Sequence, residues 1–595
     1  MKSSKNRWVI ITLIFIFVAI SASACTGQAQ DKLWLKADGW SRGVLLGDTA
    51  MASPSAPVVD SEGLVYAMLF PRVSQEVRRY TPVLVRLSSD GHSQEQIPLG
   101  FDIAQPRQAK LVLGDKKIDM FWIDSNQLKT VTLTKAGQVI SEVQVLSIED
   151  RVDHFDIVHW EGVFEVWYSG SRENPGIYSL SGDLSNPDKK VVDPDGIRID
   201  LMMDSEGRMH ASWARYPISY GEVEFFYLDT MPFAEEYQEP MLIYSTGVSP
   251  SVRVDGPVVG VDDEVGYIIW SEAIVSGLDA GVRNTFFRYF PVEEPDAIRP
   301  KMSIRVPIIA NMPADEFYSG SFDTGKRVFV YSGIPSTSSI DNVQFLDGQF
   351  EETAIVFRAR SEFKWRDFRN QANVAFLSDG LVTSYQPLSY TSAESYYPSI
   401  VTDQNKNLYV TWLEKGESTY RVYLTTTDPV KMVQIDQVTT QDYLYLAAEG
   451  LFGMMAGAVL SPFAAAAWGG IGLFAFVFNL ILSRFHKPIF RTIGEILSMA
   501  GGVGVFWFMK RATLPGLRGG EYVPFSAWIP RLPEVLHQPL TIGVPILIFL
   551  IAALVAWYNT YGKKSGSAVN FHLLYSAVDS LLSCAVYGVL IYGSF

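Results

Sequence analysis

Residues 357–369 (FRARSEFKWRDFR) place five basic side chains among aromatic rings. Arginine and aromatic side chains together can clamp a carboxylate or stack on a sugar ring. This segment therefore predicts a ligand-binding surface, which would be formed by Arg358, Arg360, Lys364, Trp365 and Arg366. The alternative is a strand whose charges face water and are partly neutralised by the two acids within the segment.

A second polar cluster consists of Glu149, Asp150, Asp153, His154, Asp156 and His159. A metal site needs several ligands on one side of the chain, whereas neighbouring strand residues point to opposite faces. We therefore expect a solvated edge strand here and no metal site. His-Glu-x-x-His, paired-cysteine, P-loop and Gly-x-Ser-x-Gly motifs are absent from the sequence, so no metal, nucleotide or other cofactor is expected.

The first 24 residues have the three parts of a secretory signal: basic residues at 2, 5 and 7, an apolar run over 8–20, and small residues at 22–24. The apolar run is shorter than the roughly 20 residues that a membrane span needs. Cys25 follows directly, which resembles a bacterial lipoprotein signal in which this cysteine carries the lipid. Cleavage after Ala24 without lipidation is the alternative, because Ala22 stands where leucine is usual.

The charge of the chain is unevenly distributed. The whole chain carries −15, whereas the residues from 441 onward contain nine basic and six acidic residues. Residues 1–440 therefore carry −18, or −21 without the three basic residues of the signal. Such a surface repels nucleic acid and anionic lipid headgroups, so no nucleic-acid partner is expected.

Four segments share one pattern, in which a strand, a polar turn and a second strand end in an aromatic residue. They are 54–70, 197–213, 250–270 and 398–412. The turn Asp-Ser-Glu-Gly occurs twice, at 60–63 and at 204–207. Aspartate starts such a turn through its side-chain hydrogen bonds, and glycine accepts the positive φ of a tight hairpin. Weaker copies lie at 110–122, 155–167 and 321–331.

The aromatic residues that end these copies are spaced by 45, 46, 57, 61 and 81 residues, and they are Trp122, Trp167, Trp213, Trp270, Tyr331 and Trp412. A period of about 40–50 residues with four short strands is typical of a β-propeller blade. We therefore predict an all-β propeller over residues 30–440 with seven blades, or eight if the longest interval holds another blade around 371–380. Residues 33–46 would supply the strand that closes the ring. An irregular array of β-sandwiches is the alternative.

The turn-plus-aromatic pattern resembles the repeats of bacterial sialidase-like propellers, which are also called Asp-box propellers. The resemblance covers residues 54–412, and no copy meets the strict Ser-x-Asp-x-Gly-x-x-Trp box. It implies a propeller fold, and it places none of the sialidase catalytic residues on this sequence. Paired carboxylates for glycoside hydrolysis stay open, because different blades would supply them.

Residues 441–595 are expected to form an all-α membrane domain, which resembles no known family. Four segments are long and apolar enough to span a bilayer: 464–483, 490–509, 540–558 and 571–592. A fifth apolar segment, 443–460, precedes them, and Ser461-Pro462-Phe463 predicts a tight turn between two helices. The Gly453-x-x-x-Gly457 spacing permits close helix packing.

The number of spans decides the topology. The short basic loops at 484–491 and 563–564 share one side of the membrane, since two spans separate them. With the propeller outside, five spans would place these loops outside, and four spans would place them inside, where positive loops are preferred. The loop charges favour four spans, whereas the apolarity of 443–460 favours five, and we lean towards five hydrophobic helices.

Two acids, Glu449 and Asp579, lie within the apolar segments. Intramembrane acids are costly and are frequently functional. A transport or proton-relay role would require these two to meet in the helix bundle. Snorkelling to the interface or hydrogen bonding between helices is the alternative.

Together these patterns predict a multi-pass protein of the bacterial cell membrane with an extracytoplasmic N-terminal propeller. The leading hypothesis is a binding or scaffolding module, without enzyme activity, for a glycan, a peptide or a membrane or envelope protein. One alternative is a membrane-tethered, sialidase-like glycoside-active enzyme, and another is a transport or receptor accessory protein. Two or three carboxylates with nearby arginines in the funnel would favour the enzyme, and an aromatic lining would favour binding.

Overall fold

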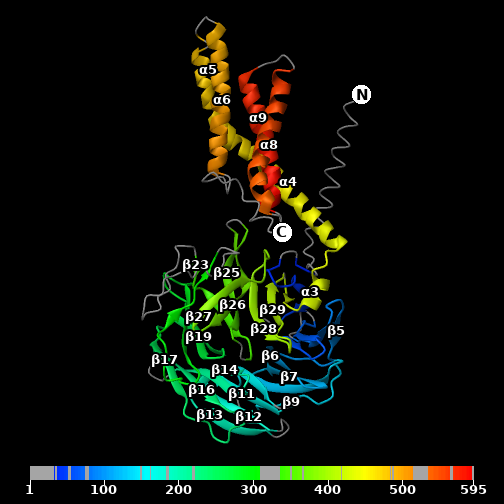
Figure 1. The fold of residues 1–595 in the computed structure, drawn as a ribbon, viewed down its shortest axis with the longest axis vertical. Helices are drawn as coiled ribbons and strands as arrows, with labels where there is room; N and C mark the ends of the chain where they lie inside the picture. The colour runs from blue at the N-terminus through cyan, green and yellow to red at the C-terminus, as the bar shows by residue number, and fades with distance from the viewer. Residues whose placement is uncertain are drawn as a thin grey trace. The chain divides into compact units, whose positions relative to one another are not determined.

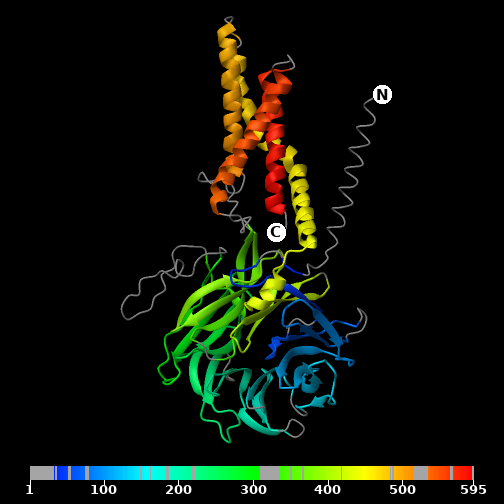
Figure 2. The same cartoon turned by 45° about the vertical axis from the view of Figure 1, so that its right-hand side comes forward.

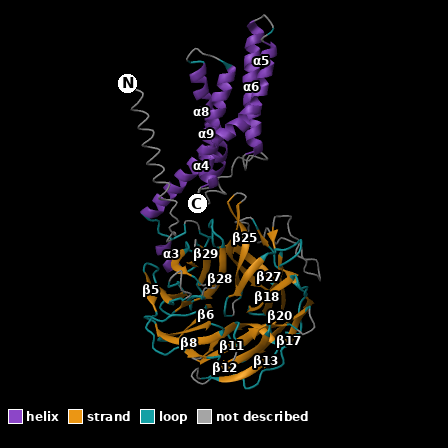
Figure 3. Cartoon of the chain, turned by 180° about the vertical axis from the view of Figure 1, so that it is seen from behind, coloured by secondary structure: helices purple, strands orange, loops and turns teal. Residues whose placement is uncertain are grey.

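The computed structural model describes residues 32–592 apart from gaps at 34–35, 51–54, 74–78, 148–150, 161–162, 183–186, 217–220, 309–335, 349–350, 365–366, 417, 483, 485–487, 514–533 and 563–566. The chain divides into two compact units (Figure 3). One comprises Ala29–Phe363 and Phe368–Gln437 and is built of strands. The other includes Val438–Phe595 and is built of helices. The predicted signal and Cys25 lie outside the described residues.

The strand-rich unit is a β-propeller of seven four-stranded antiparallel sheets, which follow one another around a ring (Figures 1 and 2). The first strand of each sheet contacts the first strands of both neighbouring sheets, so these inner strands surround the axis. The inner strands are β2 (Val58–Val59), β6 (Pro106–Leu113), β10 (His154–Trp160), β14 (Gly196–Met203), β18 (Val252–Val261), β24 (Ile340–Phe345) and β28 (Ser395–Thr402).

The other strands of each blade lie outward from its inner strand. In blades 1 to 3 these are β3 (Val65–Leu69), β4 (Val83–Leu87), β5 (Gln94–Pro98); β7 (Lys117–Asp124), β8 (Gln127–Thr134), β9 (Gln144–Val145); β11 (Val163–Ser171), β12 (Asn174–Ser181) and β13 (Asp188–Asp193). In blades 4 and 5 they are β15 (Met209–Arg215), β16 (Glu222–Thr230), β17 (Met241–Gly247); β19 (Val265–Ile274), β20 (Arg283–Pro291) and β21 (Met302–Ser303). In blades 6 and 7 they are β25 (Thr353–Lys364), β26 (Asp367–Ser378), β27 (Leu381–Pro387); β29 (Leu408–Lys415), β30 (Tyr420–Thr426) and β1 (Val44–Thr49).

Aspartate organises the turn between the first and second strands of several blades. Asp60 accepts hydrogen bonds from the amides of Glu62 and Leu64, and Gly63 takes a φ of 78°. The two predicted Asp-Ser-Glu-Gly turns are thus confirmed. The same pattern of side chain to backbone bonds recurs at Asp204, Asp262 and Asp403.

The tryptophans of the repeat pattern fill the spaces between neighbouring blades. All five lie in second strands and are at most 1% exposed: Trp122, Trp167, Trp213, Trp270 and Trp412. Large aromatic rings bury enough area to dominate the energetics of a core. The predicted spacing of these residues therefore marks the blades that the structure shows.

The sixth blade lies elsewhere than predicted. It consists of β24 to β27, and the fully buried Phe357 of β25 takes the place of the closing tryptophan. The predicted copy at 321–331 with Tyr331 lies outside the described residues, between β22 (Val306–Pro307) and β23 (Ser336–Thr337). The segment 371–380 comprises the end of β26 and the turn that leads to β27 in this same sheet, so the ring has seven blades.

The ring closes by the predicted route. The N-terminal strand β1 pairs with β30 as the outermost strand of the seventh sheet. It covers Val44–Thr49, and so overlaps the predicted segment only at its end. Each end of the propeller chain thus contributes strands to one sheet, which ties the first blade to the last.

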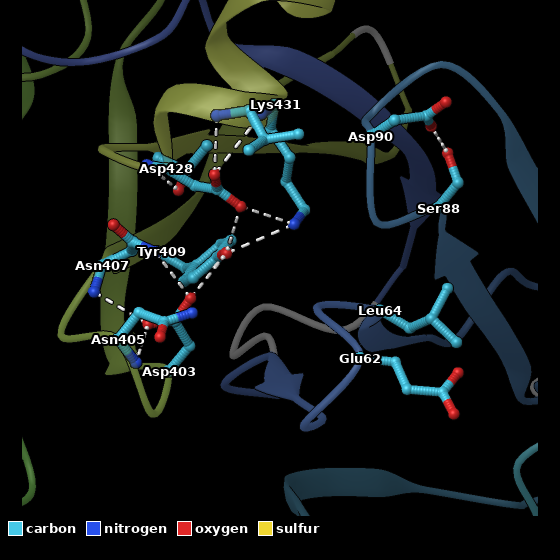
Figure 4. Close-up of polar contacts among 12 residues, drawn as sticks. Glu62, Leu64, Ser88, Asp90, Asp403, Asn405, Asn407, Tyr409, Asp428 and Lys431 are labelled. Carbon is cyan, nitrogen blue, oxygen red and sulfur yellow. Dashed lines mark hydrogen bonds and ion pairs between the residues drawn. The ribbon is translucent and has the colours of Figure 1, made fainter.

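A short helix, α3 (Pro429–Ile435), follows the last strand and is capped by Asp428. Lys431 is fully buried, and its ammonium lies 2.7 Å from Asp428 Oδ2 and 3.3 Å from the hydroxyl of Tyr409 (Figure 4). That hydroxyl also lies 3.2 Å from Asp403, the aspartate of the last hairpin turn. These contacts fix α3 on the propeller face that carries the hairpin turns.

The helical unit contains α4 (Thr440–Gly472), the 3-10 turn η1 (Leu473–Ala475), α5 (Phe476–Leu482), α6 (Pro488–Thr513), α8 (Glu534–Thr560) and α9 (Ala568–Tyr592). Within the described part of the chain, four helical segments are long and apolar enough to cross a membrane: Thr440–Ala475, Thr492–Ala512, Ile542–Thr560 and Ala568–Val589. The chain is therefore a membrane protein.

The predicted turn at Ser461-Pro462-Phe463 is wrong, because α4 runs through it without interruption. A proline removes one helical hydrogen bond, and membrane helices tolerate this loss because neighbouring groups satisfy the freed carbonyl. The segment 443–460 and the start of 464–483 therefore belong to one long helix, and the rest of 464–483 forms η1 and α5. The leaning towards five spans is corrected to four.

Glycines bring α4 against α9. A Cβ on Gly457 would lie 1.8 Å from the carbonyl oxygen of Cys584, and a Cβ on Gly588 would lie 2.4 Å from that of Gly453. The close approach predicted from the Gly453-x-x-x-Gly457 spacing is confirmed.

Candidate functional site

The inner strands of four consecutive blades contain a bulge near their start. In each of them two residues lie opposite one residue of the second strand, with register shifts between Ile197 and Asp200, Asp255 and Val258, Asp341 and Gln344, and Tyr396 and Ser399. The residue opposite each bulge is the buried aromatic Trp213, Trp270, Phe357 or Trp412. A bulge bends its strand and redirects nearby side chains, and bulges are common next to functional sites.

The first residue of each bulge has a positive φ. The values are 60° at Arg198, 96° at Gly256, 52° at Asn342 and 46° at Tyr397. This region of backbone conformation is unfavourable for large side chains, and it costs about 1–3 kcal/mol per residue where the surrounding structure enforces it. Three of these four residues are not glycine, so their bulges store strain at the propeller end where the inner strands begin, which we call the mouth.

Charged residues of blades 5, 6 and 7 form one continuous ion-pair network across the mouth. Asp255 accepts hydrogen bonds from Arg253 Nε at 2.9 Å and from Arg283 Nη1 at 3.0 Å. Arg283 also forms an ion pair with Asp341 at 3.9 Å. Arg358 then links Asp341 (3.2 Å) to Glu394 (3.3 Å).

Two neighbouring cavities open among these groups. The larger has a volume of about 620 Å³ and is lined by Arg172, Arg198, Tyr216, Arg253 and Asp153 among others. The second, of about 430 Å³, is lined by Arg253, Asp255, Arg283, Asp341, Arg358, Tyr396 and Tyr397 among others. Arg253 borders both cavities, so the two form adjoining parts of one site.

Aromatic rings accompany the arginines in these cavities. The guanidinium of Arg358 lies 4.4 Å from the ring centre of Tyr396, and that of Arg172 lies 4.5 Å from the ring of Tyr216. Burial raises the pKa of both tyrosine hydroxyls, so they remain neutral donors at physiological pH. The mouth therefore combines fixed cations, anions and neutral hydroxyls with flat ring faces.

Asp341 differs from an ordinary surface carboxylate. Burial raises its pKa, while the neighbouring Arg358 and Arg283 act in the opposite direction. A carboxyl that is poised in this way can hold a proton at higher pH than usual, which is a property of general acids.

Deeper in the channel, carboxylates connect inner strands to one another. Asp156 accepts from the amide of Leu201 at 3.1 Å, and Asp200 accepts from the amide of Val259 at 2.8 Å. Lys110 pairs with Asp156, and burial raises the pKa of Asp200. These hydrogen bonds hold the inner strands together, and the ammonium of Lys110 balances the negative charge of the carboxylates.

The predicted binding segment is divided by the structure. Arg358 lies in the mouth, whereas Arg360 is exposed on β25, with its guanidinium 5.0 Å from the ring of Phe368. Lys364 ends β25, and Trp365 and Arg366 lie outside the described residues. Of the five predicted residues, the structure thus places Arg358 alone in the ion-pair network.

The polar cluster at 149–159 is likewise dispersed. Asp153 pairs with Arg107 at 3.1 Å, and the ring of His159 lies 4.9 Å from that of Phe164. Burial lowers the pKa of His154 to about 4. Glu149 and Asp150 lie outside the described residues, among which no group of three or more His, Cys, Asp or Glu is arranged to hold a metal ion.

The two intramembrane acids do not meet. Gly453 packs against Gly588, so Glu449, one turn earlier, lies level with the end of α9. Asp579 lies about 20 Å away along the bundle, at a rise of 1.5 Å per residue. The pairing that the transport hypothesis required is therefore absent, and Asp579 pairs with Lys510 instead.

Sequence reasoning missed most of the mouth: Arg198, Arg253, Asp255, Arg283, Asp341, Glu394 and Tyr396. These residues come from four blades, where they occur singly or in pairs among ordinary strand and loop residues. The sequence feature that could have located them is the closing aromatic residue of each blade, because each bulge lies opposite that residue.

No known family profile matches the sequence, and no curated protein matches it. Solved structures with similar folds include polysaccharide lyase Uly1, with 10% identity, a TM-score of 0.43, and coverage of 66% of this chain and 99% of that one. The arabinofuranosidase of Fusarium graminearum has 10% identity and a TM-score of 0.35, with 65% and 98% coverage. The Trypanosoma rangeli sialidase has 11% identity and a TM-score of 0.32, with 67% and 61% coverage.

These neighbours are mostly propeller glycoside hydrolases and lyases, and all share low identity with this chain. They include a sialidase, as the turn-plus-aromatic pattern led us to expect.

Proposed function

We propose that the protein displays its propeller on the outer face of the membrane and binds a glycan in the mouth. The observation that carries this proposal is the ion-pair network of blades 5 to 7, which borders two adjoining cavities.

The lining suits a ligand whose hydroxyl groups both donate and accept. The guanidinium groups supply fixed donors, the carboxylates supply acceptors, and the tyrosine rings offer flat faces for a sugar ring. Both cavity volumes, about 620 and about 430 Å³, fall within the range of roughly 300–1,000 Å³ that small-ligand sites occupy. A purely apolar ligand would remove water from these polar groups without offering them hydrogen bonds, which is unfavourable.

The positions of the arginines also support a binding role. Outside the mouth the propeller is strongly acidic, so the cations of Arg172, Arg198 and Arg253 form a local exception around the larger cavity. Each mouth carboxylate already contacts an arginine, and this pairing keeps the network rigid before a ligand arrives. Rigid, preorganised polar groups lose little entropy when they bind a ligand.

The test measures binding of the intact protein, in mild detergent, to an immobilised panel of acidic and neutral oligosaccharides. Arg253→Gln is the informative variant, because Arg253 borders both cavities and its side chain is 65% exposed, so the fold should tolerate the change. We expect at least a tenfold weaker affinity for any oligosaccharide that wild-type protein retains.

Arg86→Gln is the matched control, because Arg86 forms a comparable ion pair with Glu95 in the outer half of blade 1. It should bind like the wild type. Equal affinities of the two variants, or no retention of any oligosaccharide by the wild-type protein, would contradict the proposal.

Glycoside cleavage is the second candidate function. The mouth holds three carboxylates among arginines, an arrangement that favours a glycoside-active enzyme. Burial also raises the pKa of one of them, Asp341. Release of reducing ends from a retained oligosaccharide, lost in Asp341→Asn and kept in Arg86→Gln, would decide for cleavage over binding alone.

A further inference from the structure

One face of the membrane helix α9 is polar along half its length. It carries His572, Tyr575, Ser576, Asp579, Ser580 and Ser583, each at most 3% exposed. The spacing of three and four residues places them on one side of the helix. Leu573 and Leu581, which are 49% and 46% exposed, occupy the outward side. We call the first set the α9 polar face.

A buried ion pair lies at the middle of this face. Lys510 of α6 donates to Asp579 Oδ1, and the two side chains are 2% and 0% exposed. The Asp579 carboxylate also accepts from Tyr575 at 3.2 Å and from Ser583 at 3.1 Å. Burying a charged pair in a membrane span is costly, so such pairs usually mark functional sites.

Glycines of two other helices make room for His572. A Cβ on Gly472 of α4 would lie 2.7 Å from its ring, and a Cβ on Gly502 of α6 would lie 3.0 Å from its Nδ1. Its Nε2 lies 3.0 Å from the carbonyl oxygen of Gly469. The ring is therefore enclosed by helix backbone on several sides.

Several polar atoms on or beside this face are buried and have no hydrogen-bond partner among the described residues: His572 Nδ1, Ser576 Oγ, Ser580 Oγ and Ser498 Oγ. Ser498 lies one turn before Gly502 on α6 and therefore on the side that packs against His572. Buried polar groups are almost always paired, either with protein or with internal water. Unpaired groups gathered in one place indicate bound water.

We propose that the α9 polar face is a water-filled proton path within the membrane. Water bound to His572, Ser576 and Ser580 would carry protons from one membrane surface to Asp579, which lies about 10 Å along the helix from His572. A carboxylate oxygen of Asp579 takes up the proton from this water and releases it to water on the side of Ser583, towards the other membrane surface, while Lys510 stays an ammonium. The remaining titratable neighbours of the carboxylate are Tyr575 and Cys584.

The first test measures water access by cysteine labelling in membranes, with Cys584→Ala as the background. Ser576→Cys and Ser580→Cys should react with a charged, membrane-impermeant thiosulfonate at least tenfold faster than Leu581→Cys. Leu573→Cys and Leu581→Cys are matched controls, because they lie on the same helix and face outward. Equal rates at all four positions would overturn the proposal.

The second test measures proton flux into vesicles that contain the intact protein and a pH-sensitive dye, with the membrane potential clamped by potassium and valinomycin. Wild-type protein should dissipate a pH gradient severalfold faster than protein-free vesicles. The neutral double variant Lys510→Met/Asp579→Asn should lose this excess flux. Glu495→Gln, which changes an acid of α6 away from the ion pair, should keep it. Wild-type flux equal to that of empty vesicles would overturn the proton path even if the cysteines react.

Discussion

At the scale of single residues, the closing tryptophans combine bulk with a polar anchor. Four of them donate the indole N–H to a carboxylate: Trp167 to Glu165, Trp213 to Asp193, Trp270 to Glu272 and Trp412 to Glu414. The fifth, Trp122, has a buried Nε1 without a partner. A buried indole N–H usually needs a hydrogen-bond acceptor. These acids therefore explain how the indole side chains can lie fully buried between the blades.

At Glu414, which accepts the Trp412 hydrogen bond, burial of the carboxyl lowers the stability of the fold by an amount that depends on pH. Burial raises its pKa to about 7, whereas in the unfolded chain it titrates near 4.5. Between these values the folded protein holds a proton that the unfolded chain releases, so stability falls as pH rises towards 7. A shift of this size corresponds to about 3 kcal/mol for a fully buried group.

Glu414→Gln should remove this dependence. The bonds from Trp412 and Thr391 both reach one oxygen, Oε1, which the amide retains. We expect the variant to be more stable than wild type by up to about 3 kcal/mol at pH 8, and similar at pH 4.5. Guanidinium unfolding followed by tryptophan fluorescence measures this, with the exposed Glu95→Gln as control. A variant less stable than wild type at pH 8 would contradict the assignment.

At the scale of elements, α3 depends on one buried charge. Lys431 is fully enclosed and bonded to Asp428. Lys431→Met leaves Asp428 as a buried unpaired charge, which should cost about 3 kcal/mol of unfolding free energy. Adding Asp428→Asn removes that charge and still caps the helix, since asparagine is a good N-cap. The double variant should therefore recover part of the loss in guanidinium unfolding, and a double variant no more stable than the single one would argue against the pair.

The sequence predicts these elements unequally. Aspartate turns and closing tryptophans are local signals, so the seven-bladed ring follows from their period. The sixth blade was misplaced because Phe357 replaces the tryptophan there, and a lone phenylalanine carries no signal. The helix through Pro462 was missed because a proline is locally a helix breaker, whereas here Ser461 donates a hydrogen bond at 2.8 Å to the carbonyl of Ala458, which Pro462 leaves without its helical partner.

The site was harder to predict than the fold for a related reason. Arg358 was singled out because charges crowd around it in the sequence. Asp255, Asp341 and Glu394 are distant from one another along the chain, and the side-by-side packing of blades 5, 6 and 7 brings them together. The bulges that direct them are a backbone feature opposite the closing aromatics, and this feature is invisible in composition or charge.

At the scale of the whole molecule, both ends of the propeller chain meet at one residue. Asp436, just beyond α3, accepts from the backbone amide of Arg42 at 2.8 Å and pairs with Lys36. The mouth lies at the opposite end of the inner strands from the hairpin turns that α3 contacts. The propeller chain therefore ends on the face that carries the hairpin turns.

The count of four spans resolves the conflict between loop charge and topology. With α4 as one span, an outside propeller places the basic loops at 484–491 and 563–564 inside and returns the C-terminus to the propeller's side. This orientation satisfies the preference for positive inner loops, whereas five spans would have violated it. The direction of the helices agrees, since α6 and α9 run parallel: Gly502, Trp507 and Lys510 contact His572, Tyr575 and Asp579 in that order.

Reporter fusions can test this orientation. Alkaline phosphatase, which is active only outside the cytoplasm, should be active when fused after Phe595 and inactive when fused after Gly562. A green fluorescent protein fused at the same two positions should show the reverse pattern, which controls for expression. Protease added to intact spheroplasts should remove the propeller, because the proposed orientation places it outside, on the side of the C-terminus. Phosphatase activity at Gly562 and none at Phe595 would require either an inside propeller or an odd number of spans, and would refute the orientation on which the proposed exposure of the mouth depends.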